Sequence, residues 1–207
     1  MESILPNCLM LDVDGVLVDG RPSDGRTWTY SLREDLGIDP SDLVEKFFLT
    51  EWKDVVTGRQ ELHLALTLSL SNIETNISAD ELISYWFEMD SRIVETVLAD
   101  TRIARASGFS VYLKTNQEHA RARYLMDELG LRSEVDGIVY SAMAGTQKPH
   151  LDFYAYAVKV TGRDASDHLL VDDTLGNTEG ALKAGWKAEY WVDGMSLADV
   201  LGPYMSN

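Results

Sequence analysis

The amino-acid sequence predicts an α/β protein with a mostly parallel sheet of about five strands and an inserted block of helices. From residue 109 onward, short apolar runs alternate with amphipathic helical segments, a pattern typical of βαβ units with right-handed crossovers. Between about residues 27 and 107, apolar residues recur at helical spacing and no segment resembles a strand. We therefore expect the helical block to follow the first strand and to pack as a small bundle beside the sheet.

The first strand is predicted at the apolar run that starts at Cys8 and ends on Asp12 and Asp14, with Gly15 directly after them. The run is nearly continuous in apolar residues, which indicates a buried parallel strand. Carboxylates at the end of such a strand lie where open α/β sheets bind ligands. A calcium-binding EF-hand loop is a poor alternative, because its glycine stands sixth and this one stands fourth. A capped turn is the other alternative.

The helical block contains recognisable start signals. Asp39 followed by Pro40 is typical of an N-cap with proline at the first helical position, and Ser78 with Glu81 forms a capping-box pattern. The Thr57-Gly58-Arg59 segment should interrupt the helices. Three tryptophans fall in the block, and we expect them to form its core rather than a ligand platform: Trp28, Trp52 and Trp86.

The remaining chain supplies four more strands and three helices. The strands are predicted at 109–116, 135–140, 168–171 and 186–192. The helices are predicted at 117–129, with Asn116 as N-cap, at 152–161 and at about 174–185. The alternation of the two types supports the parallel sheet.

Polar groups follow several of these strands at the same topological position. Thr115 and Asn116 end the second strand, and Asp172 and Asp173 end the fourth. The carboxyl ends of parallel strands meet at one edge of a sheet, so these groups should converge with the two aspartates of the first strand. Lys148 stands in the loop before the helix at 152–161. Taken singly, each group could be a helix cap or an exposed turn.

The net charge of the chain limits the classes of molecule that it can bind. The 207 residues carry a formal net charge of −16, without a basic run or stripe. This argues against nucleic acid and anionic membranes as partners, and it means that a phosphate site would need a metal ion or a few local cations. The single cysteine, Cys8, should be a small core residue. Residues 1–7 lack signal-peptide features and no apolar run approaches the ~20 residues of a membrane span, so we expect a soluble, cytoplasmic protein.

These motifs resemble those of the haloacid dehalogenase (HAD) superfamily of aspartate-nucleophile hydrolases, in particular the members with a helical cap between the first two motifs. The four motifs occur in the family's order: Asp12-Val13-Asp14-Gly15, Thr115-Asn116, Lys148 and Asp172-Asp173. The resemblance covers about residues 7–192 and is weak in the cap. It implies a Rossmann-like core domain from 1–18 and 105–207, with a cap domain at 19–104. Val16 and Asn177 depart from the usual family residues.

The resemblance implies a division of roles among the acids. Asp12 would be the nucleophile that forms an aspartyl-phosphate, and Asp14 would be the general acid and base. The implied cofactor is Mg²⁺, a hard ion that prefers oxygen ligands. Its protein ligands would be the Asp12 carboxylate, the Asp14 backbone carbonyl and Asp173, with Asp172 beside them.

The remaining motif residues would bind the phosphoryl group. Thr115 and Asn116 would hold its oxygens, and Lys148 would neutralise the nucleophile and the transition-state charge. Arginines and a lysine of the cap are conceivable substrate contacts: Arg21, Arg26, Lys53 and Arg59. The four histidines show no paired metal spacing and are expected to be structural or exposed.

Asp14 favours phosphate chemistry over halide chemistry. The resemblance implies that dehalogenating members lack an acid here, because a halide leaves without a proton. We therefore expect a Mg²⁺-dependent phosphatase acting on a small phosphorylated metabolite. The alternatives are a phosphomutase of the same superfamily, a 2-haloacid dehalogenase and a non-catalytic binding protein. The sequence leaves the oligomeric state and the identity of the substrate open.

Overall fold

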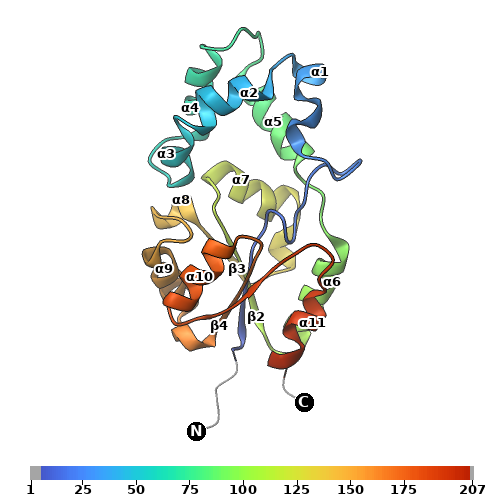
Figure 1. Cartoon of the computed structure of the whole chain (residues 1–207), viewed down its shortest axis with the longest axis vertical. Helices are drawn as coiled ribbons and strands as arrows, with labels where there is room; N and C mark the ends of the chain where they lie inside the picture. The colour runs from blue at the N-terminus through green and yellow to red at the C-terminus, as the bar shows by residue number, and fades with distance from the viewer. Residues whose placement is uncertain (1–5, 206–207) are drawn as a thin grey trace.

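The computed structural model of the protein, which describes residues 6–205, contains a five-stranded parallel sheet (Figure 1). The strands are β1 (Cys8–Leu11), β2 (Ser110–Thr115), β3 (Gly137–Tyr140), β4 (His168–Asp172) and β5 (Lys187–Tyr190). Their order across the sheet is β3-β2-β1-β4-β5, so the first strand occupies the centre. This confirms the predicted α/β class and the predicted number of strands.

The apolar run of β1 explains its central place. All four residues of the strand are fully buried, because β1 has a neighbouring strand on each side and helices over each face. Leu11 pairs with Leu113 of β2 and with Val171 of β4. This register brings the residues that follow each strand to the same edge of the sheet.

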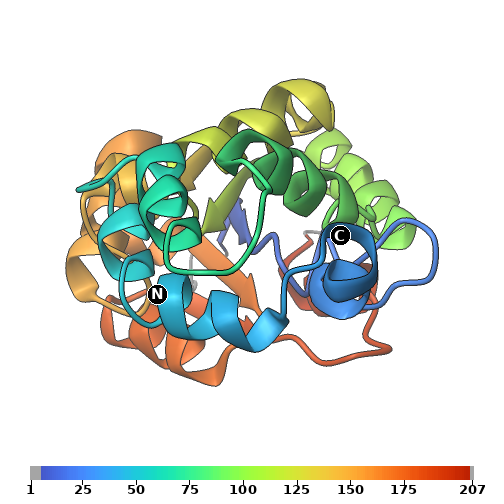
Figure 2. The same ribbon diagram turned by 90° about the horizontal axis from the view of Figure 1, so that it is seen from above.

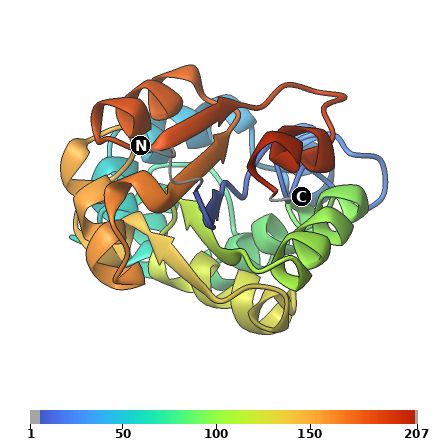
Figure 3. The ribbon, with the colours of Figure 1, turned by 90° about the horizontal axis from the view of Figure 1, so that it is seen from below.

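Alternation along the strands separates two hydrophobic layers. Leu9 and Leu11 belong to a cluster shared with α6 (Glu95–Ala106), α11 (Leu197–Leu201) and the π-helical turn η3 (Tyr124–Glu128). Met10 belongs to the cluster on the opposite face, under α9 (Leu151–Thr161) and α10 (Leu175–Lys183). Figure 3 shows α9 and α10 in orange on one side of the sheet, and α6 and α11 on the other. The sheet is therefore covered on both faces.

Most of the helices between β1 and β2, all except α6, form a second body above the carboxyl edge of the sheet (Figure 1), and Figure 2 shows them from above. We call the segment 28–89 the inserted helices. They are η1 (Trp28–Ser31), α1 (Leu32–Leu36), α2 (Pro40–Leu43), the π-helical turn η2 (Val44–Phe48), α3 (Trp52–Val56), α4 (Leu62–Leu70) and α5 (Ala79–Met89). They share a hydrophobic cluster of their own, in which Trp28 stacks on Trp86 with 5.0 Å between ring centroids. Trp52 packs against the same cluster, as the sequence predicts.

The predicted start signals of the inserted helices are confirmed. The Asp39 carboxylate accepts a hydrogen bond from the backbone N–H of Ser41, with Pro40 at the first helical position of α2. Ser78 and Glu81 form a reciprocal capping box at the start of α5. Local polar contacts therefore define these two helix starts.

The helix predicted at 117–129 starts later than expected. Asn116 does not cap it; α7 (His119–Arg123) begins after Glu118, whose carboxylate accepts hydrogen bonds from the N–H groups of Ala120 and Arg121. The prediction of Asn116 as N-cap is therefore wrong. Its side chain is used elsewhere, as described below. The chain continues from α7 directly into η3.

The extent of a cap domain at 19–104 stays a prediction, and the packing of α6 bears on it. Val97, Leu98 and Ala104 of α6 belong to the cluster that covers the sheet, not to the cluster of the inserted helices. We therefore favour an end of the cap near Asp90, where α5 stops.

Short helices complete the fold: α8 (Ser141–Ala144), η4 (Leu131–Ser133), η5 (Ala165–Asp167) and η6 (Gly202–Tyr204). Within residues 6–205, no helix has the length and apolar character to cross a membrane.

Candidate active site

The polar ends of β1, β2 and β4 line a cavity of about 350 Å³ at the carboxyl edge of the sheet. Its walls come from these strand ends and the residues after them, from the first turn of α10 and from the loop between α8 and α9: Asp12, Asp14, Gly15, Thr115, Asn116, Lys148, Asp173, Thr174 and Asn177. The other residue predicted for the site, Asp172, is fully buried and contacts Lys148. The structure thus brings the predicted residues together, as the parallel register requires.

The loop after β1 needs glycine at position 15. Gly15 has φ +78°, a left-handed conformation that side chains with a Cβ rarely adopt. A Cβ at this position would also overlap the Asp173 carboxylate. Gly15 N–H donates to the Val18 carbonyl at 2.9 Å, which closes the turn. The glycine therefore lets the β1 loop approach the acids that follow β4.

Lys148 holds two carboxylates at once. Its ammonium group lies 2.7 Å from Asp12 Oδ1 and 2.6 Å from Asp172 Oδ2, and it donates to the Lys114 carbonyl at 3.0 Å. The side chain is only 2% exposed, so these three acceptors replace its hydration. Asn116 positions the loop that carries Lys148. The amide of Asn116 accepts from the Lys148 N–H at 2.8 Å and donates to the Lys148 carbonyl at 3.2 Å.

Asp172 is held from the side of α10. One carboxylate oxygen accepts from the Thr174 N–H at 2.9 Å and from the Asn177 amide at 2.8 Å. Asn177, which departs from the usual family residue, therefore donates to a carboxylate where a second acid would repel it. The Tyr154 hydroxyl in turn donates to the Asn177 carbonyl at 2.6 Å.

Three carboxylates of the site are close enough to share a cation. Asp12, Asp172 and Asp173 each offer an oxygen within 4.8 Å of the others. A set of carboxylate oxygens suits a hard divalent ion such as Mg²⁺. Asp173 is exposed enough to meet an ion that keeps several waters, whereas Asp12 and Asp172 are buried. The residues present therefore fit the cofactor that the sequence implies.

The electrostatics of the acids favour a bound cation. Burial raises the pKa of Asp12 to about 8, although the neighbouring Lys148 lowers it. Burial, and then the negative charge of Asp90, raise the pKa of Asp14 to about 6. Burial and then the charge of Asp172 also raise the pKa of Asp173. A divalent ion would reverse these shifts, because it stabilises the ionised form of each carboxyl group.

Sequence reasoning missed two polar residues beside the site. Gln117 donates through Nε2 to Asp14 Oδ2 at 2.5 Å. Arg121 is buried and donates to the carbonyls of Phe87 and Asp90, which lie at the end of the inserted helices. The position of Gln117, directly after the second motif, was the only signal in the sequence.

The cationic residues proposed as substrate contacts lie outside the cavity. Arg21 donates to the Ser31 hydroxyl at 2.6 Å, Arg59 pairs with Asp54 at 2.8 Å, and Arg26 lies over the Tyr30 ring at 4.1 Å. Lys53 is exposed on α3. The described cavities around Asp12 and Asp14 are lined by none of the four.

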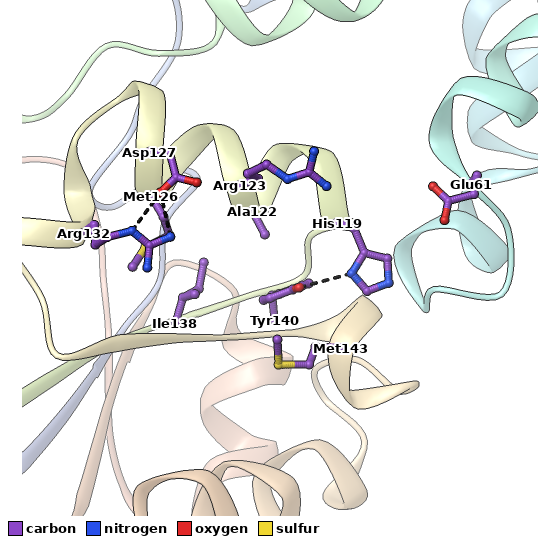
Figure 4. Close-up of a pocket in the computed structure, with 10 residues that line it drawn as sticks. All are labelled: Glu61, His119, Ala122, Arg123, Met126, Asp127, Arg132, Ile138, Tyr140 and Met143. Carbon is purple, nitrogen blue, oxygen red and sulfur yellow. Dashed lines mark hydrogen bonds and ion pairs between the residues drawn. The ribbon is translucent and has the colours of Figure 1, made fainter.

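Two other cavities lie near the site. One of about 340 Å³ shares Asp14 and Gly15 with the site and reaches Trp28 in the inserted helices. Another of about 560 Å³ is larger than the site but contains none of its predicted residues (Figure 4). In Figure 4, the Glu61 side of the inserted helices faces His119 across this space, and His119 lies 3.1 Å from the Tyr140 hydroxyl. Size alone therefore does not locate the site.

The comparisons with known proteins agree with the fold and the motifs. A family model described as haloacid dehalogenase-like hydrolase matches residues 6–185. A sesquiterpene phosphatase from Aspergillus oryzae is 31% identical over 98 residues, which are 46% of this chain and 48% of that protein. The chain thus spans about half the length of the curated relative that it matches.

Two solved structures share the fold over nearly the whole chain. A HAD family enzyme from Bacteroides thetaiotaomicron, in complex with magnesium and inorganic phosphate, has a TM-score of 0.79 at 15% identity, with 94% of this chain and 98% of that chain covered. A HAD-like family hydrolase from Porphyromonas gingivalis has a TM-score of 0.78 at 16% identity, with coverage of 98% and 99%. These identities show a shared fold alone. Because the family model covers most of the chain and the motifs stand in its order, the chain belongs to the haloacid dehalogenase-like hydrolases.

Proposed function

We propose that the protein is a Mg²⁺-dependent phosphatase that acts through an aspartyl-phosphate on Asp12. The observation that carries the proposal is the presence of Asp14 in the same cavity as Asp12 and Lys148. An alkoxide leaving group needs a proton, whereas a halide does not. A carboxyl group at this position can supply that proton, so it favours hydrolysis of phosphate esters. The matched phosphatase of Aspergillus oryzae supports the same reaction class.

In the proposed first step, an Asp12 carboxylate oxygen attacks phosphorus while the bond to the ester oxygen breaks. Asp14 gives its proton to that oxygen, and the alcohol leaves. In the second step, Asp14 takes a proton from water, whose oxygen attacks phosphorus and releases inorganic phosphate and the free Asp12 carboxylate. The same Asp14 carboxyl group gives a proton in the first step and regains one in the second, so it returns to its starting state.

The other residues would balance the charge of the phosphoryl group. Lys148 already lies at Asp12 and would offset the negative charge of the transition state. The Thr115 hydroxyl would donate to a phosphoryl oxygen. The Asn116 side chain is engaged with the backbone of Lys148, so we assign the contact of Asn116 to its backbone N–H.

The carboxylates of Asp12 and Asp173 and the Asp14 carbonyl would hold the metal ion, with Asp172 beside them. When bound, Mg²⁺ would neutralise these acids and the phosphoryl oxygens and thereby allow an anionic substrate to enter an acidic site. Lys148, which is the one cationic side chain that lines the described cavity, would neutralise the negative charge that the metal ion leaves.

The cavity on the Asp14 side is the natural place for the leaving group, because Asp14 must reach its oxygen. This space, of about 340 Å³, is lined by ten residues: Asp14, Gly15, Val18, Asp19, Gly20, Gly25, Thr27, Trp28, Thr29 and Asp90. None of these is a lysine or an arginine. The adjacent Arg92 is already paired with Asp19 at 2.8 Å.

These walls favour a small alcohol with hydroxyl or amino groups. A second phosphate or a carboxylate would meet three aspartates without a free cation. A terpenyl chain would meet only two large apolar side chains, Val18 and Trp28. We therefore propose phosphorylated sugar alcohols or amino alcohols as the substrate class, rather than bisphosphates or terpenyl phosphates.

The proposal is tested by measuring phosphate release from a panel of phosphate esters with Mg²⁺ or with chelator. We expect release only with Mg²⁺, and none from Asp12→Asn. Trapping of a beryllium fluoride or aluminium fluoride complex on Asp12 should also require the metal. Full activity of Asp12→Asn would refute the mechanism, and failure to hydrolyse any ester would favour a binding protein. Transfer to a second hydroxyl would identify a mutase, and halide release from a 2-haloacid with chelator would identify a dehalogenase.

A further inference from the structure

The inserted helices touch the sheet domain at a point that is connected to the proposed acid. After α3, Gly58 approaches the start of α8 so closely that a Cβ on it would overlap the Ala142 carbonyl oxygen and lie 3.1 Å from the carbonyl carbon. Gly58 has φ +71°. The cavity of Figure 4, between Glu61 and His119, separates other parts of the two bodies. A further contact is made by α5, where Phe87 packs against Tyr124 with 5.3 Å between ring centroids.

A buried serine reinforces the contact. The Ser141 hydroxyl donates to the Val56 carbonyl at the end of α3, at 2.6 Å, and lies 3.1 Å from the Gln117 carbonyl oxygen. The N–H of Ala142 also donates to the Gln117 carbonyl, at 3.1 Å. The backbone of Gln117 is therefore fixed by the two residues of α8 that meet the inserted helices.

The side chain of Gln117 completes the connection. It is 6% exposed, and its Nε2 lies 2.5 Å from Asp14 Oδ2. An amide that donates to one carboxyl oxygen leaves the other oxygen free to face the leaving group. Because the side chain is buried, Gln117 has little rotational freedom once its backbone is held.

We propose that Gln117 is a positioning residue for the Asp14 carboxyl group, and that docking of Gly58 and Val56 on α8 holds Gln117 in place. The inference rests on the proposed function, because it assumes that Asp14 gives a proton to the leaving group. On this proposal, docking of the inserted helices both covers the site and holds the Asp14 carboxyl group in its working orientation. The orientation is lost when these helices move away from α8. Neither the family motifs nor the resemblance assigns a role to Gln117, Ser141 or Gly58.

The test compares two substrates that differ in their need for a proton. The nitrophenolate of p-nitrophenyl phosphate leaves without protonation, whereas the alkoxide of glycerol phosphate needs the acid. Because Asp14 also acts as base in the second step, which is the same for both substrates, the comparison uses kcat/KM, which reports only steps up to departure of the leaving group. For Gln117→Met, we expect kcat/KM on glycerol phosphate to fall about tenfold or more, and kcat/KM on p-nitrophenyl phosphate to change by less than about threefold. A structural role of Gln117 would lower both rates alike, and that result would overturn the proposal.

The docking part is tested with a matched pair of glycines. Gly37 has φ +69° and open space around it, so Gly37→Ala introduces the same backbone strain as Gly58→Ala without a clash. We expect Gly58→Ala to reproduce the substrate-selective loss of Gln117→Met and Gly37→Ala to behave as the wild type. Equal behaviour of the two alanine variants on both substrates would refute the coupling.

Ser141→Ala provides a second route if Gly58→Ala fails to fold, because it removes one hydroxyl and adds no atoms. It should show the same substrate-selective loss, and equal losses on both substrates would again overturn the coupling.

The activity of the wild-type protein distinguishes failure of this inference from failure of the proposed function. If the wild-type protein hydrolyses neither substrate, the proposed function fails; if it hydrolyses both and the variants lose both equally, only the positioning role fails.

Discussion

The ammonium group of Lys148 lies 2.6 Å from the Asp172 carboxylate, and both side chains are almost fully buried. The two residues come from a loop and from β4, and they meet beside Asp12, to which Lys148 is also paired. Burial alone would lower the pKa of Lys148, but the two carboxylates more than offset it and raise the pKa. Lys148 thus stays charged and forms ion pairs with two buried carboxylates, Asp12 and Asp172.

Replacement of Lys148 by methionine should destabilise the protein and abolish phosphate release. Two carboxylates would lose their cation, and removal of one partner of a buried ion pair typically costs about 3–5 kcal/mol. Urea unfolding with chelator present measures the loss in the free energy of unfolding. Lys183→Met is the control, because Lys183 is 70% exposed and lies 4.0 Å from its partner Glu179. An unfolding midpoint of Lys148→Met equal to that of the control would contradict the prediction.

Asp173→Asn should weaken the binding of Mg²⁺ while leaving the fold intact. The carboxylate is partly solvated, so its loss removes a charged ligand without opening a cavity. We expect the Mg²⁺ concentration for half-maximal activity to rise about tenfold or more. Titration of activity with Mg²⁺ measures the change. Asp193→Asn, at another exposed aspartate, is the control for charge alone and should match the wild type.

Lys114→Met should increase the free energy of unfolding at neutral pH. Lys114 is fully buried over the rings of Phe153 and Tyr154, at 3.8 and 3.9 Å, and its ammonium nitrogen has no hydrogen-bond partner among the described residues. Burial, and then the charge of Lys148, hold its pKa well below 10.5. Because the unfolded chain binds the proton up to about that pH and the folded chain does not, the burial of Lys114 destabilises the protein increasingly as pH falls below 10.5.

The gain in the free energy of unfolding for Lys114→Met, and its dependence on pH, follow from the lowered pKa of the buried lysine. An unsatisfied buried donor typically costs about 1–3 kcal/mol, which methionine would recover in part. The advantage of the variant should shrink as pH rises toward 10.5, the ordinary pKa of lysine. Urea unfolding at several pH values measures it. A variant that is less stable than the wild type at pH 7 would show that the aromatic contacts of Lys114 outweigh its burial.

His168 should make the protein lose stability in mild acid. Its ring stacks on Trp186 at 4.4 Å, and its nitrogens lie 2.8 Å from the Asp164 carbonyl and 2.9 Å from the Thr161 hydroxyl. Burial lowers the pKa of His168 below 6.5. The unfolded chain therefore binds the proton first, and the stability contributed by neutral His168 is complete above pH 6.5 and decreases as pH falls below it.

The measurement is the free energy of unfolding between pH 7.5 and about 5 in wild type and variants. The acids of the site titrate in the same window with raised pKa values and oppose the trend, so the comparison with His168→Gln isolates the histidine. The His168→Gln curve should fall less steeply than that of the wild type. Exposed His150 gives the control, and His150→Gln should follow the wild type. Parallel curves for all three proteins would rule out the assignment.

The sheet and the convergence of the motifs could be predicted because both depend on strongly patterned segments. The apolar run of β1 and the acids at its end are visible in the sequence, and parallel pairing alone aligns Leu11 with Leu113 and Val171. The helix starts at Asp39 and Ser78 are likewise local. Short-range chemistry and the geometry of parallel strands sufficed for these features.

The rest depends on contacts between distant segments. Asn116 is well suited to cap a helix, but its amide is taken by the backbone of Lys148, 32 residues away. Gln117 looks like an ordinary residue of the next helix until Asp14 is placed beside it. Gly58 reads as a simple interruption of the helices, and only the position of Ala142 shows why it lacks a side chain. No local pattern encodes such pairings.

The central place of β1 has a consequence for synthesis. Of the five strands, β1 is synthesised first. Its partner on one side, β2, follows about a hundred residues later, and β4 completes its other side only with residues 168–172. Long-range pairing of this kind is slow, because the intervening chain must close a large loop. The nascent chain therefore holds an unprotected apolar edge on β1 until β4 emerges, and Asp172 and Asp173 emerge only at that point. The second strand partner of β1 and the acids at the end of β4 are therefore made together, before β5 is added to the edge of the sheet.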